Sequence, residues 1–354
     1  MLPVAATHSE NVLDALFLPL ADRVVPLPAD GRVLFLRARD GFRLREMAAP
    51  GWLCEQGFKP FADALERSGL TVGEASDDQR FALVLVLPPR QRDEARALYA
   101  RAVRHVAPGG VVLACVANAE GAKSAEADLA RLTGRVGHLS KHKCRAFWSA
   151  PLADRVDGAL LAEWSSLDAP RRNAASYWSR PGLFAWDRVD PASALLVRHL
   201  PAELHGRVAD LGAGFGYLAC ELLRRCDGIT TLHLHEAERR ALELARDNLS
   251  EALVAHGRKA TTEVFWHDVT RGLSQRYDAI VSNPPFHQGR ADQPELGRAF
   301  IAAAADALVP QGQLWLVANR HLPYEATLST RFSEVQTVAE EGGFKVISAR
   351  GAHA

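Results

Sequence analysis

Asn283-Pro284-Pro285-Phe286 closes an apolar run, Tyr277–Ser282, whose length and composition predict a buried strand. The asparagine offers a side-chain carbonyl oxygen. The first proline offers a backbone carbonyl of restricted direction, because proline fixes φ. The phenylalanine offers a flat face, so the motif suits a planar substrate that carries an NH₂ group, such as a nucleobase or an amide. Taken alone, the motif is equally compatible with a simple turn, since Asn-Pro is a common turn dipeptide.

A glycine-rich loop upstream supplies the context. The predicted strand Arg207–Leu211, which contains Asp210, runs into Gly212-Ala213-Gly214-Phe215-Gly216, and an apolar helical pattern follows. A strand, a glycine turn and a helix place backbone N–H groups and a helix N-terminus against a ligand. A dinucleotide fingerprint would have glycine at position 217, where this chain has Tyr217. The Asp-x-Gly-x-Gly-x-Gly spacing instead resembles the S-adenosylmethionine loop of Rossmann-like methyltransferases.

Two further predicted strands end in acidic residues. Glu236 follows the strand Thr231–His235 and is placed for ribose hydroxyls. Asp268 follows the strand Glu263–Trp266 and could accept a hydrogen bond from an adenine amine. Together with the glycine loop and Asn283, these strand ends predict a methyltransferase site with S-adenosyl-L-methionine as cofactor.

The chain resembles the bacterial ribosomal RNA guanine-N2 methyltransferases of the RsmC/RlmG type. The matching segments of its second half are Pro181–Phe184, Asp210–Gly214, Ser282–His287 and Val317–Asn319. In its first half, Gly121–Glu126 and Lys143–Arg145 look like the shorter signatures of that family. The resemblance covers most of the chain and is weakest before Phe81.

This resemblance implies methyl transfer from S-adenosyl-L-methionine to the exocyclic N2 amine of a guanine in small-subunit (16S) ribosomal RNA, with the RsmC-like branch preferred. The implied catalytic residues are Asn283, Pro284 and Phe286. The implied cofactor-binding residues are Asp210, Gly212, Gly214, Gly216, Glu236, Asp268 and Asn283. The implied substrate-binding residues are Phe286, His287, Arg290 and Arg320.

Other functions stay open at this stage. A large-subunit guanine-N2 methyltransferase would carry the same motifs. Enzymes that methylate adenine N6 or a protein glutamine amide also use Asn-Pro-Pro-aromatic motifs, but usually with tyrosine or tryptophan last, so Phe286 favours guanine. A non-enzymatic RNA-binding assembly factor that has kept the fold is a further alternative, which the intact glycine loop and Asn283 disfavour.

The first half of the chain repeats the plan of the second. The apolar strand Phe81–Leu87 runs into Pro-Pro where the second half has Asn-Pro-Pro, and in both halves a helix and a strand ending in Val-Ala-Asn follow. The predicted helices are Arg92–His105 and Leu296–Leu308. Leu87 takes the place of Asn283 and offers no acceptor, and the strand Val33–Leu36 has no glycine loop after it. We therefore expect two copies of one fold, the first of them catalytically silent.

The predicted fold is α/β, with tandem duplicated Rossmann-like class I methyltransferase domains, each a mainly parallel doubly wound sheet. Residues 1–164 would form a degenerate domain without cofactor, with an RNA-docking or structural role, residues 165–182 a linker, and residues 183–354 the catalytic domain. The ligand crevice is expected at the carboxyl ends of the strands, where the strand order reverses.

Composition limits the class of partner. The chain has 354 residues, 48% of them hydrophobic, no net charge and a pI of about 7.2. A wholly basic nucleic-acid binder is therefore excluded, and an RNA footprint must be local. The first basic cluster comprises Lys123, Lys141, His142, Lys143 and Arg145. The second comprises Arg171, Arg172, Arg180, Arg290, Arg320 and His321.

Five cysteines without a Cys-x-x-Cys pair predict reduced core thiols, with neither disulfide nor metal site. No apolar run is long enough to span a membrane, and the N-terminus lacks the basic region of a signal peptide. We expect a cytoplasmic monomer whose partner is ribosomal RNA or the small ribosomal subunit, without a membrane.

Phe184, before the predicted helix Ala192–Leu200, lies beside the cofactor pocket in the family. A core phenylalanine at a domain junction is the alternative.

Overall fold

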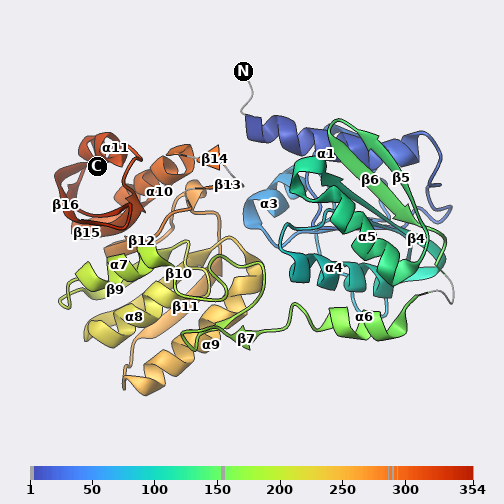
Figure 1. Ribbon diagram of the computed structural model, residues 1–354. Coiled ribbons are helices and arrows are strands. Elements are labelled where there is room, and N and C mark those ends of the chain that lie inside the picture. The colour runs from blue at the N-terminus through green and yellow to red at the C-terminus, as the bar shows by residue number, and fades with distance from the viewer. Residues whose placement is uncertain (1–3, 153–155, 286, 289–290, 293, 354) are drawn as a thin grey trace. The chain divides into compact units, whose positions relative to one another are not determined.

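The computed structural model describes residues 4–152, 156–285, 287–288, 291–292 and 294–353. The chain divides into two compact units, residues 1–169 and 170–354 (Figure 1). Each unit has its own sheet, with helices on both faces.

Unit 1 is built on a sheet with the strand order β2-β1-β3-β4-β6-β5. Strands β1 to β4 are parallel to one another, and β6 and β5 add an antiparallel edge. The strands are β1 (Val33–Leu36), β2 (Trp52–Glu55), β3 (Phe81–Val86), β4 (Val106–Ala117), β5 (Val136–Lys141) and β6 (Cys144–Ser149). The helices are α1 (Val4–Ala21), α2 (Phe42–Met47), α3 (Lys59–Arg67), α4 (Arg92–His105), η1 (Asn118–Glu120), α5 (Ala122–Thr133) and α6 (Gly158–Ser165).

Unit 2 has the strand order β11-β10-β9-β12-β15-β17-β16, in which only the contacts of β17 are antiparallel among the described residues. Its main strands are β9 (His205–Leu211), β10 (Gly228–Glu236), β11 (Thr261–Trp266), β12 (Tyr277–Ser282), β15 (Leu308–Asn319), β16 (Phe332–Glu341) and β17 (Phe344–Ala352). Two short pairs are β7 (Arg171–Arg172) with β8 (Trp178–Ser179), and β13 (His287–Gln288) with β14 (Ala291–Asp292). The helices are α7 (Pro191–His199), α8 (Tyr217–Arg225), α9 (Arg239–Ala255), η2 (Val269–Arg271), α10 (Pro294–Ala307) and α11 (Tyr324–Arg331).

Alternation along the strands gives the sheet of unit 2 two buried faces. Val208 packs in the cluster formed with α7, α8 and α9, whereas its neighbour Ala209 packs in the cluster formed with α10 and α11. Successive side chains of a strand point to opposite faces, so both faces need apolar residues. This explains why the central strands are apolar throughout.

The strand orders confirm the duplication. Without β11, the order in unit 2 is β10-β9-β12-β15-β17-β16, which matches β2-β1-β3-β4-β6-β5 strand for strand. The predicted α/β class with mainly parallel sheets is also confirmed. The antiparallel edge pairs were not predicted from the sequence, because their residues are largely partly buried or exposed, as in β5 and β16, and carry no apolar run.

Helix α3 buries Ala62 and Leu65 against the core of unit 1. Phe61 of the same helix is partly buried, and its ring lies 5.1 Å from the Phe58 ring.

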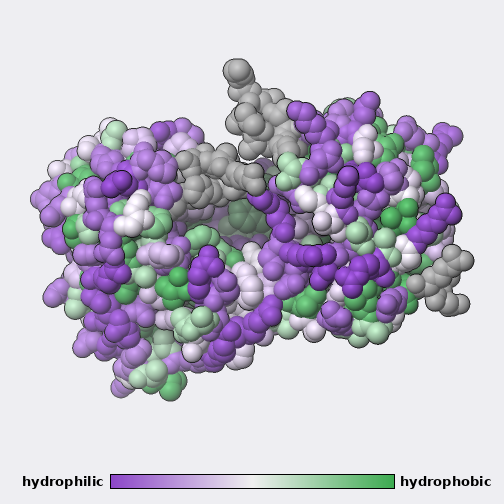
Figure 2. Space-filling view, in the orientation of Figure 1, coloured by the Kyte–Doolittle hydropathy of each residue, from purple (hydrophilic) through white to green (hydrophobic). Residues whose placement is uncertain are grey.

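The surface view shows mainly hydrophilic side chains on both units, with apolar ones in small groups between them (Figure 2). All five cysteines are buried and free, as expected for core thiols. Within the described residues, no helix has the length and apolar character needed to cross a membrane, and no grouping of His, Cys, Asp and Glu suits a metal ion.

Candidate active site

The glycine loop and the Asn-Pro-Pro motif meet where the strand order of unit 2 reverses. β9 and β12 are parallel neighbours in which Leu211 pairs with Ser282, so Gly212 and Asn283 are the next residues at the same edge. The Ser282 hydroxyl donates to the Leu211 carbonyl at 2.7 Å and ties the two strand ends together. A doubly wound sheet opens its ligand crevice at such a point.

The glycine loop is held by the end of β10. Gly212, with φ +73°, donates its N–H to the His235 carbonyl at 2.8 Å. Gly214, with φ +55°, donates its N–H to Glu236 Oε2 at 2.7 Å. A Cβ atom on Gly214 would meet no atom within 4 Å, so the backbone faces open space that a ligand can approach closely.

Asp210 is an uncompensated acid behind this loop. It is fully buried, and neither carboxylate oxygen has a hydrogen-bond partner of good geometry among the described residues. Burial raises the pKa of Asp210 to about 8, with Glu236 adding to the effect and the Ala219 backbone N–H opposing it. An orphaned buried carboxyl fits a site that receives positive charge from its ligand.

Glu236 and Asp268 already have partners. Besides Gly214, Glu236 accepts from the Glu238 backbone N–H at 2.6 Å, and these donors partly offset the burial that raises its pKa. Asp268 caps η2: its Oδ1 accepts from the Thr270 N–H at 3.0 Å and the Thr270 hydroxyl at 2.6 Å. The carboxylate predicted to bind adenine therefore also shapes the local turn.

The Asn283 side chain is fixed by the start of α7. Its Nδ2 donates to Asp190 Oδ2 at 2.9 Å and to Ser193 Oγ at 2.8 Å. Neither bond uses Oδ1. Pro284 follows and is buried. The sequence analysis missed Asp190 and Ser193. Asp190 followed by Pro191 is a recognisable helix start. That pattern indicates a capping carboxylate, but it does not reveal that the same carboxylate also accepts from Asn283.

The remaining predicted residues lie beyond these contacts. Phe286 and Arg290 fall outside the described residues. His287 begins β13, which pairs antiparallel with β14. Arg320 directly follows β15, the strand beside β12, and is exposed at the same edge of the sheet as Asn283.

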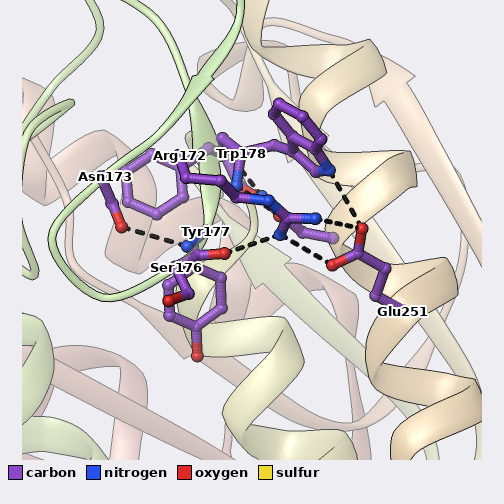
Figure 3. A network of polar contacts seen from close by, with 8 residues as sticks. Arg172, Asn173, Ser176, Tyr177, Trp178 and Glu251 are labelled. Carbon is purple, nitrogen blue, oxygen red and sulfur yellow. Dashed lines mark hydrogen bonds and ion pairs between the residues drawn. The ribbon is translucent and has the colours of Figure 1, made fainter.

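The segment from Arg171 to Asp190, here called the strap, is folded onto unit 2 (Figure 3). Arg172 makes a two-bond ion pair with Glu251 of α9, at 2.8 and 2.6 Å, and its guanidinium lies 4.1 Å from the centre of the Trp178 ring. The Trp178 indole N–H donates to Glu251 at 3.0 Å. The part of the predicted linker from Arg171 on therefore packs against α9.

Asn248 connects the strap to the glycine loop. Its Oδ1 accepts from the Trp178 N–H at 2.8 Å, and its Nδ2 donates to the Trp178 carbonyl at 2.9 Å and the Phe215 carbonyl at 2.8 Å. Asn248 is 3% exposed. In the strap, Leu183 is buried, whereas Phe184 is 70% exposed, so the interpretation of Phe184 as a core residue was wrong.

The corresponding positions of unit 1 have lost this chemistry. In β1 and β3, Leu36 pairs with Val86 as Leu211 pairs with Ser282. By this register, and by the pairing of β1 with β2, Phe35, Arg37, Gln56 and Leu87 take the places of Asp210, Gly212, Glu236 and Asn283. Arg37 keeps the left-handed backbone, with φ +53°, and its guanidinium donates to the Leu87 carbonyl at 3.3 Å.

Comparison with known proteins places the chain in a family. Residues 174–348 match the family model described as "Methyltransferase small domain". "Ribosomal RNA small subunit methyltransferase C" of Shewanella oneidensis is 32% identical over 75% of this chain and 76% of that protein. The same-named protein of Psychromonas ingrahamii is 29% identical over 77% of this chain and 76% of its own length.

A solved structure matches this chain over nearly its whole length. The 16S rRNA N2 methyltransferase (RsmC) of T. thermophilus, solved in complex with AdoMet and guanosine, superposes with a TM-score of 0.76 at 25% identity. The match covers 96% of this chain and 91% of that one, and so includes both units. With the site at the switch point and these relatives, the chain belongs to the ribosomal RNA small subunit methyltransferase C family.

Proposed function

We propose that this chain transfers the methyl group of S-adenosyl-L-methionine to the N2 amine of a guanine in small-subunit (16S) ribosomal RNA. The observation that carries the proposal is the Asn283 amide, whose NH₂ group is occupied by Asp190 and Ser193 beside the glycine loop. Its oxygen is thereby left to accept from a substrate amine. The choice of guanine and of 16S RNA rests on the family and on the relative solved with AdoMet and guanosine.

The residues at the glycine loop fit the cofactor. Gly214 leaves room for close backbone approach, and Asp210 and Glu236 supply carboxyl groups near the loop. When bound, S-adenosylmethionine supplies an electrophilic methyl group on a positively charged sulfur. The buried carboxyl of Asp210 favours such a cation because no other charge compensates it. We assign ribose recognition to Glu236 and adenine recognition to Asp268.

The proposed role of the Asn-Pro-Pro-Phe motif is to prepare the amine. The N2 lone pair of guanine is delocalised into the ring, so the amine is a poor nucleophile. Hydrogen bonds from its two protons to Asn283 Oδ1 and the Pro284 carbonyl favour a more pyramidal nitrogen, with its lone pair aimed at the methyl carbon. As the N–C bond forms, the S–C bond breaks. The nitrogen then releases a proton to solvent, so positioned acceptors suffice without a strong base. Phe286 would stack on the extruded base.

We propose that unit 1 contacts the RNA backbone through its basic turn, Lys141–Lys143. His142 and Lys143 both have positive φ, 51° and 56°, in a hairpin turn where glycine and asparagine are usual. The turn is tied to the end of β4, because the Asn118 N–H donates to the Lys143 carbonyl at 2.9 Å. The turn holds its basic side chains exposed, where they can reach phosphates.

A hollow of about 450 Å³ adjoins this turn. It is lined by Asn118, Gly121, Ala122, Lys123, Ser124, Ser140 and Arg145. The segments Gly121–Glu126 and Lys143–Arg145, which look like short signatures of the family, contact each other here. Glu126 accepts hydrogen bonds from Arg145 Nε and, at 3.1 Å, from Arg145 Nη2. Exchanging Lys123, Lys141 and Lys143 for alanine is expected to raise KM for RNA and to make that KM less sensitive to salt concentration. Affinity for S-adenosylmethionine should stay unchanged.

The decisive experiment supplies purified small subunits, large subunits and naked 16S RNA with S-adenosylmethionine labelled in the methyl group, followed by digestion to nucleosides. N2-methylguanosine from the small-subunit or 16S sample is the expected product. Label only in large subunits would overturn the choice of RNA, and N6-methyladenosine would overturn the choice of guanine.

We propose that the enzyme acts as a monomer in the cytoplasm. Sedimentation with and without RNA tests the monomer.

A further inference from the structure

We propose that Asp190 and Ser193 are positioning residues that lock the Asn283 amide with its oxygen toward the substrate and so restrict the site to acceptors that present an NH₂ group. This inference rests on the proposed function, because it explains the selectivity of the same site. It concerns residues that do not touch the reacting atoms and act through Asn283.

The lock is a closed set of hydrogen bonds at the start of α7. Asp190 Oδ2 accepts from the Ser193 backbone N–H at 2.8 Å, which caps the helix, and from Asn283 Nδ2 at 2.9 Å. The Ser193 hydroxyl oxygen is the second acceptor for Nδ2, at 2.8 Å. Ser193 is 7% exposed and Asp190 is partly buried, so bulk water competes little for these bonds.

The chemistry of the acceptors fixes which end of the amide faces inward. An asparagine amide is nearly symmetric in shape, and its last torsion has two broad wells. A carboxylate can only accept hydrogen bonds. If the amide turned over, Asn283 Oδ1 would face Asp190 Oδ2, and two acceptors would meet in a partly buried place. The penalty corresponds to a preference of roughly tenfold or more for the observed orientation.

The consequence is selectivity for the chemical group of the substrate. With Oδ1 held forward, a base that presents an amine gains a hydrogen bond, whereas a base that presents a carbonyl oxygen meets a second acceptor and is rejected. An amide that was free to turn could receive either group. In unit 1 the equivalent residue is Leu87, which has no amide to orient.

Asp190→Ser is the informative variant, because serine also caps helices. Asp190→Asn would not serve, since its carbonyl oxygen could take the place of Oδ2 and accept from both Ser193 and Asn283. The serine hydroxyl is shorter and can donate as well as accept, so it gives the Asn283 amide no preferred orientation. We expect kcat for RNA methylation to fall tenfold or more, with the KM for RNA and the affinity for S-adenosylmethionine within about threefold of wild type. Ser193→Ala removes one acceptor and should give a smaller loss of the same kind.

Each variant is repeated in the Asn283→Ala background. A positioning role predicts less than a twofold further loss there, because the group to be positioned is gone. An equal loss in both backgrounds, or an unchanged kcat in Asp190→Ser, would overturn the proposal. Circular dichroism and cofactor affinity check that each variant folds, and Ser193→Ala supplies the same comparison if Asp190→Ser does not fold.

A readout without RNA separates this inference from the proposed function. In ¹⁵N–¹H spectra of the full chain, the Asn283 side-chain NH₂ signals, identified by their loss in Asn283→Ala, should exchange slowly with water and become fast-exchanging in Asp190→Ser. Fast exchange already in the wild type would refute the lock. A wild-type protein with slow exchange that methylates no RNA would refute the function and leave the lock standing.

Discussion

At the scale of single residues, the site separates two tasks. Asn283, proposed to face the substrate, is held by Asp190 and Ser193, whereas Glu236 contacts the glycine loop proposed to bind the cofactor and Asp210 lies behind that loop. Separate side chains for binding and for chemistry mean that each can be changed with a different kinetic signature.

Asn283→Ala is expected to lower kcat by roughly a hundredfold or more, the typical cost of removing one preorganised polar group. Affinity for S-adenosylmethionine should stay within a few-fold of wild type, because the amide is proposed to face the base. Single-turnover methylation and titration calorimetry measure the two quantities. Gly214→Val is the matched opposite, since a side chain there fills the space the ligand needs and should abolish cofactor binding. An Asn283→Ala enzyme of normal activity would remove the central role of the motif.

The buried carboxyl of Asp210 is expected to make cofactor binding depend on pH. Its folded pKa of about 8 lies above the value of about 3.9 expected in the unfolded chain. Between these values the folded free protein holds the proton more tightly, so its stability falls as pH rises through this window. A bound cation favours the ionised carboxylate, so binding should release protons and tighten as pH rises toward 8.

Calorimetry at pH 6 in two buffers of different ionisation enthalpy measures this release. Asp210→Asn cannot ionise, so it should release clearly fewer protons than the wild type; any remainder is assigned to Glu236, whose pKa burial also raises. Equal proton release in the two proteins would show that Asp210 does not titrate with the ligand.

At the scale of elements, the strap is held to α9 by two kinds of contact. The Arg172–Glu251 pair is exposed, with 40% and 51% of the side chains accessible, and surface ion pairs of this kind contribute about 0–1 kcal/mol. Asn248, one turn away on the same helix, is buried and satisfies backbone groups of both Trp178 and Phe215. The buried contact should therefore dominate.

Asn248→Ala is expected to lower the free energy of unfolding by roughly 2–3 kcal/mol, because backbone groups lose their partners away from water. It should also weaken cofactor binding, since Phe215 belongs to the glycine loop. Glu251→Ala is the control on the same helix, with an expected cost below about 1 kcal/mol. Urea unfolding and cofactor titration of both variants provide the test. Equal effects would mean that the surface pair matters as much as the buried amide.

At the scale of the whole molecule, one fold serves twice and only one copy keeps the site. The two sheets share their strand order, but Phe35, Arg37, Gln56 and Leu87 replace the residues that would bind ligand. Arg37 is the clearest change, because its side chain starts at the left-handed position that glycine occupies in unit 2 and reaches the Leu87 carbonyl. Unit 1 has therefore kept the scaffold, which depends on the apolar core, but it has lost the polar residues of the site.

We expect one S-adenosylmethionine per chain, bound to unit 2. Calorimetry of the full chain gives the stoichiometry, and a fragment that begins near residue 165 should fold, bind the cofactor with similar affinity and methylate RNA poorly. Gly214→Val in the full chain serves as the control, because it should reduce the stoichiometry to zero. A stoichiometry of two would mean that unit 1 has kept a working site despite Arg37.

The sequence by itself determined the elements and the places of the motifs. The bounds expected for Tyr277–Ser282 and Arg92–His105 agree with β12 and α4, and the predicted repeat agrees with the two strand orders. Apolar runs, helical periodicity, glycine and proline are local signals that act over a few residues. Parallel strands then bring their carboxyl ends to one edge, so the meeting of Asn283 with the glycine loop could also be foreseen.

Only the tertiary structure decided how the site is held. Asp190 reaches Asn283 across 93 positions of the chain, and Asn248 reaches Trp178 across 70. A capping aspartate or a helical asparagine has the same local signature whether or not its side chain meets a distant partner. Such hydrogen bonds form only when the packing of the whole unit brings two distant segments together. The residues around each partner in the sequence do not indicate how far apart the two segments lie in space.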